Sequence, residues 1–209
     1  MSKTYLGDYA YETIRERILR CEYAPNTYVT EERLVSELNI SRTPIRTALN
    51  ALSKEHIIQI FPKKGVYITD ITPDQVRNIY ECRSLIEPYA LRTYGNSFPK
   101  QRLKDLLSQF RKEDPDAWSL CTQDSAFHTE IIRLCHNDLL SAYYASIESL
   151  NLRLSYYACM QSSRFVQSNH EHIGIITAML KDDLSLAEQL LRAHLDTSRN
   201  SAYDTLLQL

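Results

Sequence analysis

The sequence has little glycine, no Cys-x-x-Cys pair and no long apolar run. Glycine occurs only 4 times in 209 residues, and no stretch approaches the ~20 apolar residues of a membrane helix, so we expect no membrane partner. The first residues are polar and of mixed charge, so we expect no secretory signal peptide. The cysteines number 5, an odd count that argues against a disulfide framework or a thiolate zinc site and favours reduced thiols in a cytoplasmic protein.

The composition is that of a folded domain with one basic region. Apolar residues make up 44% and charged residues 24% of the chain, which excludes disorder throughout. The net charge of −2 conceals a local asymmetry, because residues 39–66 hold 5 basic side chains and 1 acidic side chain. A basic patch on a nearly neutral chain indicates that this region binds a polyanion.

Proline and glycine divide the chain into two parts. All 7 prolines lie at or before Pro115, and the 94 residues that follow contain one glycine, Gly174. The second part is therefore expected to consist of long helices with few breaks. We place a domain boundary near residues 70–72, which gives domains 1–70 and 71–209.

The first domain has the pattern of a winged helix-turn-helix. Thr30 is a suitable N-cap for the second of its helices, and Pro44 lies in the first turn of the third, where a missing N–H costs nothing. The segment before Thr30 is expected to be a connector. Helices are predicted over residues 8–21, 30–38 and 43–56, and strands over 57–61 and 66–71, joined by the hairpin loop Pro-Lys-Lys-Gly.

The third helix and the hairpin tip carry groups suited to duplex DNA. Hydroxyls and helix-end N–H groups bind phosphates, arginine reaches guanine O6 and N7 in the major groove, and Gly65 would allow close approach of the wing backbone. Apart from Glu55, this face is expected to lack acids. The alternatives are a winged domain that contacts proteins and, for Arg33, a role only at the surface. The predicted DNA-binding residues are Arg33, Ser41, Arg42, Thr43, Pro44, Arg46, Lys63, Lys64 and Gly65.

These residues carry a family resemblance. SRTPIRTALNALSKEHII, with TEERLVSELNI upstream, resembles the DNA-binding domain of GntR-family bacterial transcription regulators, whose usual pattern is close to VSRTPVREALRRLEAEGLV. The run from Ser41 to Pro44, and Arg46, match it over a resemblance that covers about residues 8–70. Thr47 replaces the pattern's Glu and His56 replaces its Gly, which leaves the DNA-contact positions in place.

The second domain is predicted to be an antiparallel helical bundle of six helices. Thr72 and Pro73 form a helix start with a Thr…Gln capping box, and Pro88 is expected to kink that first helix. The fold class is therefore mainly α, an N-terminal winged helix-turn-helix followed by an all-α bundle. The expected helices cover residues 73–94, 99–112, 115–134, 138–162, 165–181 and 183–206.

One carboxylate and three imidazoles are predicted to face the interior of this bundle. Asp124 and His128 share an inward helix face at i, i+4. His170 and His172 lie about 200° apart around their helix, and His172 is the one on the apolar face. His194 also faces inward. Burial of these groups unpaired would be unfavourable, and a divalent cation such as Zn²⁺, Ni²⁺ or Mn²⁺ would relieve it, with positions left open for water or a ligand.

The same four residues resemble the metal signature of FCD, the ligand-binding domain of the FadR subgroup of GntR regulators. That signature is Asp-x-x-x-His, then His after Glu, then a last His, and it matches Asp124, His128, His172 and His194 over about residues 73–206. Six helices suit the shorter, VanR-like form of the domain. The resemblance implies a metal-binding site, with zinc the first expectation.

Arg83 is the candidate effector-binding residue. It lies in IYECRSLIEPYA, which matches the family segment E-x-R-x-x-(Leu/Ile)-E, whose arginine often faces the effector pocket. A small organic acid bound to the metal could pair bidentately with this guanidinium. The alternative is an Arg83–Glu87 surface pair worth a few tenths of a kcal/mol. Arg153, Tyr156 and Tyr157 are further candidates for the cavity wall.

The leading interpretation is a metabolite-responsive transcription regulator that contains a metal. It would form a homodimer through the helical domain and read a palindromic operator with half-sites about one helical turn apart. One alternative is a metal-dependent hydrolase, although no interior Glu or Asp besides Asp124 is expected to serve as a general base. The other is a dimerisation domain whose metal is purely structural.

Overall fold

The computed structural model describes residues 3–112, 116–161 and 164–207. The predicted helix ends at Pro115 and Ser162 lie outside these ranges. The chain divides into two compact units, Met1–Ile71 and Thr72–Leu209. None of the described helices is both long and apolar enough to span a bilayer.

Unit 1 is a winged helix-turn-helix with a small sheet. Its helices pack through apolar faces at the predicted spacing, with Ile14 and Ile18 of α1, Leu34 of α2, and Ile45 and Leu49 of α3 all buried. Thr30 caps α2, since its side chain accepts from the Arg33 N–H at 3.2 Å. The elements are α1 (Lys3–Leu19), β1 (Thr27–Val29), α2 (Glu31–Leu38), α3 (Arg42–Ser53), β2 (Ile58–Phe61) and β3 (Gly65–Ile68).

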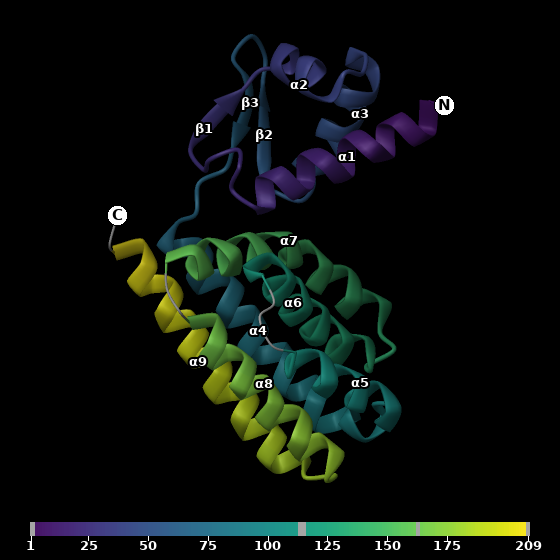
Figure 1. Ribbon diagram of the computed structural model, residues 1–209, viewed down its shortest axis with the longest axis vertical. Helices are drawn as coiled ribbons and strands as arrows, with labels where there is room; N and C mark the ends of the chain where they lie inside the picture. The colour runs from purple at the N-terminus through teal and green to yellow at the C-terminus, as the bar shows by residue number, and fades with distance from the viewer. Residues whose placement is uncertain (1–2, 113–115, 162–163, 208–209) are drawn as a thin grey trace. The chain divides into compact units, whose positions relative to one another are not determined.

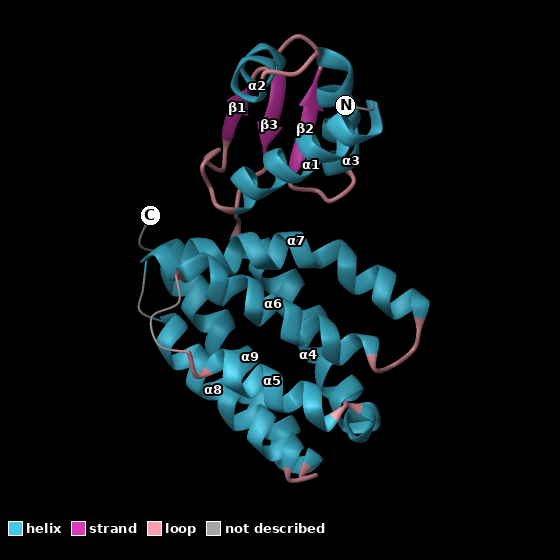
Figure 2. Ribbon diagram, turned by 45° about the vertical axis from the view of Figure 1, so that its right-hand side comes forward, coloured by secondary structure: helices cyan, strands magenta, loops and turns pink. Residues whose placement is uncertain are grey.

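The expectation of a connector before Thr30 is wrong, because this segment contains the strand β1. It pairs antiparallel with β3, with Thr27 opposite Ile68 and Val29 opposite Val66, so the sheet order is β1-β3-β2 (Figure 2). Only Val29 of its three residues is buried. Three residues are too few to show the alternation of apolar and polar side chains that predicts a strand. The extended conformation of β1 depends on its pairing with β3.

Gly65 is constrained by the chain's own packing. It has a φ of 104°, which other residues rarely adopt, and a Cβ at this position would lie 2.9 Å from the carbonyl oxygen of Val29. Gly65 was expected to let the wing backbone approach DNA closely. The contact between β3 and β1 already requires a glycine at this position. The helix α3 ends at Ser53, three residues before the predicted end, and His56 beyond it has a φ of 60°.

Unit 2 is a bundle of α-helices (Figure 1). The helices α8 and α9 run antiparallel side by side, and α9 also packs against α4. Its apolar core includes Leu91, Phe127, Ile131, Ile175 and Leu191. The described elements are α4 (Pro73–Tyr94), the 3₁₀ turn η1 (Gly95–Ser97), α5 (Lys100–Phe110), α6 (Ala117–Arg133), α7 (Asp138–Gln161), α8 (Arg164–Leu180) and α9 (Leu184–Leu207).

The helix α4 begins at the predicted cap and continues through a proline. Thr72 accepts from the Gln75 N–H at 3.3 Å. Pro88 has no N–H to donate to the carbonyl of Ser84, four residues earlier. Nη1 of Arg192 on α9 lies 3.5 Å from that carbonyl oxygen, so a neighbouring helix supplies a donor where α4 lacks one.

Candidate functional site

Three helices bring four potential metal ligands together inside unit 2. Asp124 and His128 come from α6, His172 from α8 and His194 from α9, and their ligand atoms all lie within 4.8 Å of one another. Nε2 of His172 lies 3.2 Å from Nε2 of His128 and 3.1 Å from Oδ1 of Asp124. Bonds of about 2.1 Å to one metal place ligand atoms about 3.0–4.2 Å apart, so only the widest pairs would need to close.

The three imidazoles are almost completely shielded from solvent. His128 and His172 are 0% exposed and His194 is 2% exposed. His170, two residues before His172, is exposed. The structure therefore separates the two neighbouring histidines as the helical spacing predicted.

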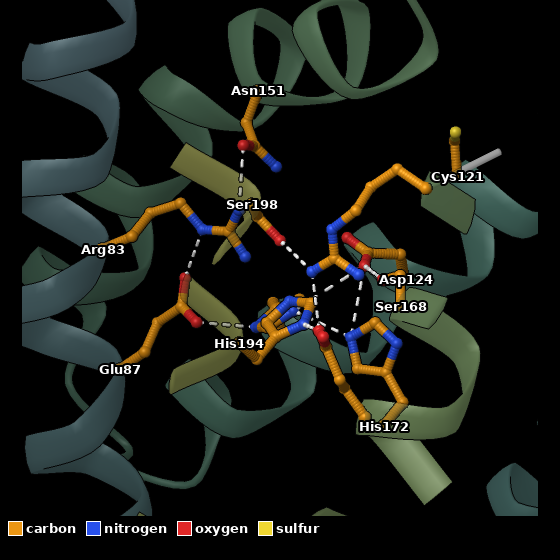
Figure 3. A network of polar contacts seen from close by, with 12 residues as sticks. Arg83, Glu87, Cys121, Asp124, Asn151, Ser168, His172, His194 and Ser198 are labelled. Atoms are coloured by element: carbon orange, nitrogen blue, oxygen red, sulfur yellow. Dashed lines mark hydrogen bonds and ion pairs between the residues drawn. The ribbon is translucent and has the colours of Figure 1, made fainter. Parts of the chain in front are cut away.

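Glu87 fixes the orientation of His128. Its Oε1 accepts from Nε of Arg83 at 2.6 Å (Figure 3). The same oxygen accepts from the hydroxyl of Tyr144 at 2.7 Å, and Oε2 of Glu87 lies 2.6 Å from Nδ1 of His128. Burial acts to raise the pKa of Glu87, but Arg83 and His128 outweigh it and lower that pKa. An ionised Glu87 beside Nδ1 favours the His128 tautomer with its proton on that nitrogen, which leaves Nε2 as the nitrogen that could bind a metal.

Glu171 performs the same role for His194. Its Oε2 lies 2.8 Å from Nδ1 of His194 and accepts from Nη2 of Arg164 at 2.6 Å. The same Arg164 nitrogen donates to Ser198 at 3.1 Å. A carboxylate behind an imidazole fixes its tautomer and raises its basicity as a ligand. Nε2 of His194 is thereby left as the lone-pair nitrogen.

His172 is held by aromatic packing instead of a carboxylate. Its ring stacks on Phe110 with centroids 4.8 Å apart, and its Nδ1 is buried with no hydrogen-bond partner among the described residues. Burial lowers the pKa of His172 well below its ordinary value and also lowers the pKa of His194. Both rings are therefore neutral at pH 7, which is the form that binds metals.

Asp124 completes the cluster with a negative charge. Burial acts to raise the pKa of Asp124, but the surrounding imidazoles, His172 foremost, outweigh it and lower that pKa to about 2. The groups bonded to this cluster comprise the guanidiniums of Arg83 and Arg164 and the carboxylates of Glu87, Asp124 and Glu171. Two cations and three anions leave a net charge of minus one, which a divalent cation would reverse.

A pocket with about 590 Å³ of empty space, part of it open to solvent, adjoins the cluster. Arg83, Asp124, Arg164 and His194 line it, and Nη2 of Arg83 is buried without a hydrogen-bond partner in the described part of the chain. The further candidates for the cavity wall, Arg153, Tyr156 and Tyr157, are not among the residues that line this pocket. The helix α7 contributes Leu154, Ser155, Ala158 and Cys159 to the wall instead, while the ring of Tyr156 packs edge-on against Trp118.

The alternative of an Arg83–Glu87 pair at the surface is excluded, since the two residues are 1% and 0% exposed. The expectation of no interior acid besides Asp124 is wrong, because Glu87 is a second one, although three donors already occupy it. The signals available in the sequence were the i, i+4 spacing of the pair and the position of Glu171 directly before His172.

Two arginines of α3 form ion pairs with glutamates of α2. Nε of Arg46 pairs with Glu31 at 2.9 Å, and Nη2 of Arg42 pairs with Glu32 at 3.2 Å. The expectation of a face without acids apart from Glu55 is therefore wrong, and Glu55 itself binds Tyr11 and Arg15. A groove beside these pairs is lined by Thr30, Glu31, Glu32, Arg42, Arg46 and residues 60–66, which include Lys63, Lys64 and Gly65.

The remaining predicted DNA-contact residues differ in exposure. Arg33 is turned to another side of α2, where its guanidinium pairs with Glu37 at 2.6 Å and lies 5.4 Å from the ring centre of Tyr23. Pro44 is buried in the core, so its part is structural. Ser41 and Thr43 are exposed, and the Ser41 side chain makes no capping hydrogen bond at the start of α3.

Comparison with known sequences matches both units to described families. The family of bacterial regulatory proteins named gntR matches residues 6–68, and the FCD domain family matches residues 78–197. The chain belongs to the GntR family and carries an FCD domain. This GntR–FCD protein is a transcription regulator with a DNA-binding winged helix-turn-helix, and its family is not one of enzymes.

Curated relatives match most of the length of this regulator. An uncharacterised helix-turn-helix transcriptional regulator of Streptomyces ambofaciens is 28% identical over 88% of this chain and 80% of its own. The gluconate operon transcriptional repressor of Bacillus subtilis is 26% identical over 95% of this chain and 85% of its own.

Solved structures share the fold. A GntR transcriptional regulator from Rhodococcus sp. RHA1 superposes with a TM-score of 0.78 at 18% identity, covering 95% of this chain and 97% of its own. The FCD domain of TM0439, solved with bound Zn²⁺, has a TM-score of 0.57 at 20% identity and covers 66% of this chain and 99% of its own.

Replacement of Glu87 tests the buried network. We expect Glu87→Gln to lower the free energy of unfolding of unit 2 by about 3–5 kcal/mol, because it leaves the Arg83 guanidinium buried without its anion. Urea unfolding in the presence of a chelator, followed by the fluorescence of Trp118, the single tryptophan, measures this change. As a matched control, Glu188→Gln removes a carboxylate paired with the mainly exposed Arg92 and Arg192 and should cost less than about 1 kcal/mol. Equal effects of the two variants would contradict a special role for Glu87.

Proposed function

We propose that this regulator binds a divalent cation at Asp124, His128, His172 and His194 and uses it to hold a small organic acid that changes operator affinity. The observation that carries the proposal is the convergence of four ligand atoms within 4.8 Å, with carboxylates behind two of the imidazoles. A lone buried histidine needs no metal, but three buried imidazoles and one carboxylate whose ligand atoms lie this close together form a donor set that suits a divalent cation.

Zinc is the cation that this ligand set favours. Three imidazole nitrogens and one carboxylate oxygen suit Zn²⁺ and Ni²⁺ better than Mn²⁺, which prefers a larger share of oxygen ligands. The zinc-bound FCD domain of TM0439 has the same fold and supports this choice. When bound, the cation would supply Lewis acidity toward the pocket, and a ligand would join the four protein donors only at a coordination number above four.

A small carboxylate fits the charge and the donors of the pocket. With a divalent cation the bonded groups change from a net charge of minus one to plus one, which an anionic ligand would neutralise. Nη2 of Arg83 is a buried donor without a partner among the described residues, at the wall of the pocket. A carboxylate placed between the metal and Arg83 would satisfy both groups. The name of the Bacillus subtilis relative makes gluconate one compound to test.

The protein would bind DNA as a homodimer that reads a palindromic operator. It would do so in the cytoplasm. Recognition would use the exposed Ser41, Thr43, Arg42 and Arg46 at the start of α3 in the major groove, with Lys63 and Lys64 on the backbone. A dimer pairs two such helices by symmetry.

An exposed apolar patch on unit 2 supports this dimer. Leu85 and Tyr89 of α4 are 75% and 53% exposed, and Leu139 and Tyr143 of α7 are 83% and 46% exposed. Sγ of Cys82 on α4 lies 2.6 Å from the hydroxyl of Tyr143, so the two helix faces are continuous. Contiguous apolar surface of this kind is typical of an interface between subunits.

The metal site is tested by two neighbouring histidines. His172→Ala removes a buried ligand and should abolish or strongly reduce the metal content, whereas His170→Ala changes an exposed ring and should leave one metal per protomer. Elemental analysis after dialysis against a weak chelator measures both. The reverse pattern would contradict the ligand assignment, and full retention by both variants would place the metal elsewhere.

The effector is tested by titrating small acids, gluconate first, against operator binding. We expect the wild-type affinity for DNA to change by roughly 5–150-fold, the range of about 1–3 kcal/mol typical of allosteric coupling. Arg83→Lys keeps a cation beside Glu87 but loses the second nitrogen, so the response should weaken while metal content stays unchanged. An operator affinity that is indifferent to every acid would indicate that the metal only supports the bundle.

The recognition helix is tested with operators selected from a random duplex library. Arg46→Ala should lower affinity by about 5–150-fold, the 1–3 kcal/mol of a bidentate base contact. Glu31→Gln should raise affinity for random duplex, because it removes the anion that competes for Arg46, and Arg33→Ala should have little effect. Titration of salt in the same assay must show a steep loss of affinity. Binding that is insensitive to ionic strength would refute the DNA-binding role of this face.

A further inference from the structure

Two thiols meet in the wall of the pocket. Cys121 on α6 and Cys159 on α7 are separated by 38 residues in the sequence, and their Sγ atoms lie 3.2 Å apart. Both residues line the pocket beside the imidazole cluster, and both are free cysteines. Figure 3 shows Cys121 on the same side of the cluster as Asp124, which lies one helical turn further along α6.

This arrangement is close to what a disulfide needs. A disulfide holds its sulfur atoms about 2.05 Å apart, so the two Sγ atoms have to approach by only about 1 Å. The two cysteines lie on α6 and α7, which pack against each other, so the helix contact keeps the two sulfur atoms close together. Cys135 provides a contrast within the same unit, since it belongs to the apolar core and is not among the residues that line the pocket.

The two thiols differ in their hydrogen-bonding roles. Cys121 donates its S–H to the sulfur of Cys159. This hydrogen bond lowers the pKa of the Cys159 thiol, and the nearby Arg164 acts in the same direction against burial. Cys159 is also the more accessible of the two, because Cys121 is only 3% exposed. A small reagent that enters the pocket would therefore meet the more reactive sulfur first.

We propose that Cys121 and Cys159 form a modification site at which a hydroperoxide, a small neutral oxidant, closes an intramolecular disulfide in the pocket wall. The site depends on the two helices alone and is present with or without a bound cation. The pocket would then respond to an oxidant as well as to the proposed anionic ligand.

The chemistry balances in two steps. The Cys159 thiolate attacks a peroxide oxygen, the O–O bond breaks, and the leaving hydroxide takes the Cys121 proton to become water, which leaves a sulfenic acid on Cys159. The Cys121 thiolate then attacks that sulfur, the S–O bond breaks, and the second hydroxide takes up a proton from solvent. Two thiols are oxidised to one disulfide, and one hydrogen peroxide is reduced to two waters. Formation of the Cys159 thiolate releases one proton to solvent, and the second step takes one proton back.

The test uses the full-length regulator, reduced and then freed of reductant, in zinc-loaded and metal-free forms. Each is treated with stoichiometric hydrogen peroxide, denatured, alkylated and digested for mass spectrometry. We expect the peptides of Cys121 and Cys159 joined in one species that is lighter by two hydrogen atoms than the sum of the reduced peptides. Cys135 should remain alkylated.

Three variants separate the pair from general oxidation. Cys135→Ser should leave the cross-link intact, and Cys159→Ser should abolish it and leave Cys121 alkylated. Cys121→Ser should leave Cys159 as a sulfenic acid, because no second thiol can resolve it, and a second equivalent of hydrogen peroxide should convert it to sulfinic acid. The proposal is overturned if wild-type protein keeps both thiols alkylated, if both are oxidised further without a cross-link, or if Cys135 cross-links as readily as Cys159.

Discussion

The buried pairing of Glu87 with Arg83 and His128 is the interaction on which the rest of the regulatory domain depends. One carboxylate neutralises a guanidinium that has no access to solvent and sets the proton position of an imidazole in the cluster. A buried charge is strongly destabilising when its opposite charge is removed, so each of these charged groups depends on its partner. Because the same carboxylate contacts Arg83 and His128, any ligand that draws Arg83 away changes the electrostatic environment of His128. The proposed metal site and the proposed effector site are thus linked through a single side chain.

The sequence was sufficient for most of the fold because its signals were local. Helical periodicity, the Thr30 and Thr72 caps and sparse glycine in the second half specify elements that depend on residues close in sequence. The strand β1 was missed because its conformation depends on pairing with β3, forty residues away. The predicted end of α3 lies three residues beyond the observed one. His56 adopts a left-handed backbone conformation, which a histidine in the sequence does not predict.

The candidate site shows the same division between local and distant information. Helix faces were enough to choose His172 over His170 and to bring Asp124 and His128 together. They were not enough to find the supporting carboxylates, since Glu87 reaches His128 from another helix and a pair at i, i+4 looks the same in sequence whether buried or exposed. The Cys121–Cys159 contact likewise links helices α6 and α7 and has no signature in the spacing of the cysteines.

The pairing of Arg42 and Arg46 with Glu32 and Glu31 has a consequence for how the protein searches a chromosome. Each guanidinium already has an anion, so a passing phosphate gains little by displacing it. A guanine edge that offers two acceptors in the correct place gains more. In the proposed role of Arg42 and Arg46, the carboxylates of α2 would compete with phosphates for these side chains and shorten residence on arbitrary sequence. The protein would then give up some overall adhesion to DNA in return for a sharper distinction between its own sites and all others.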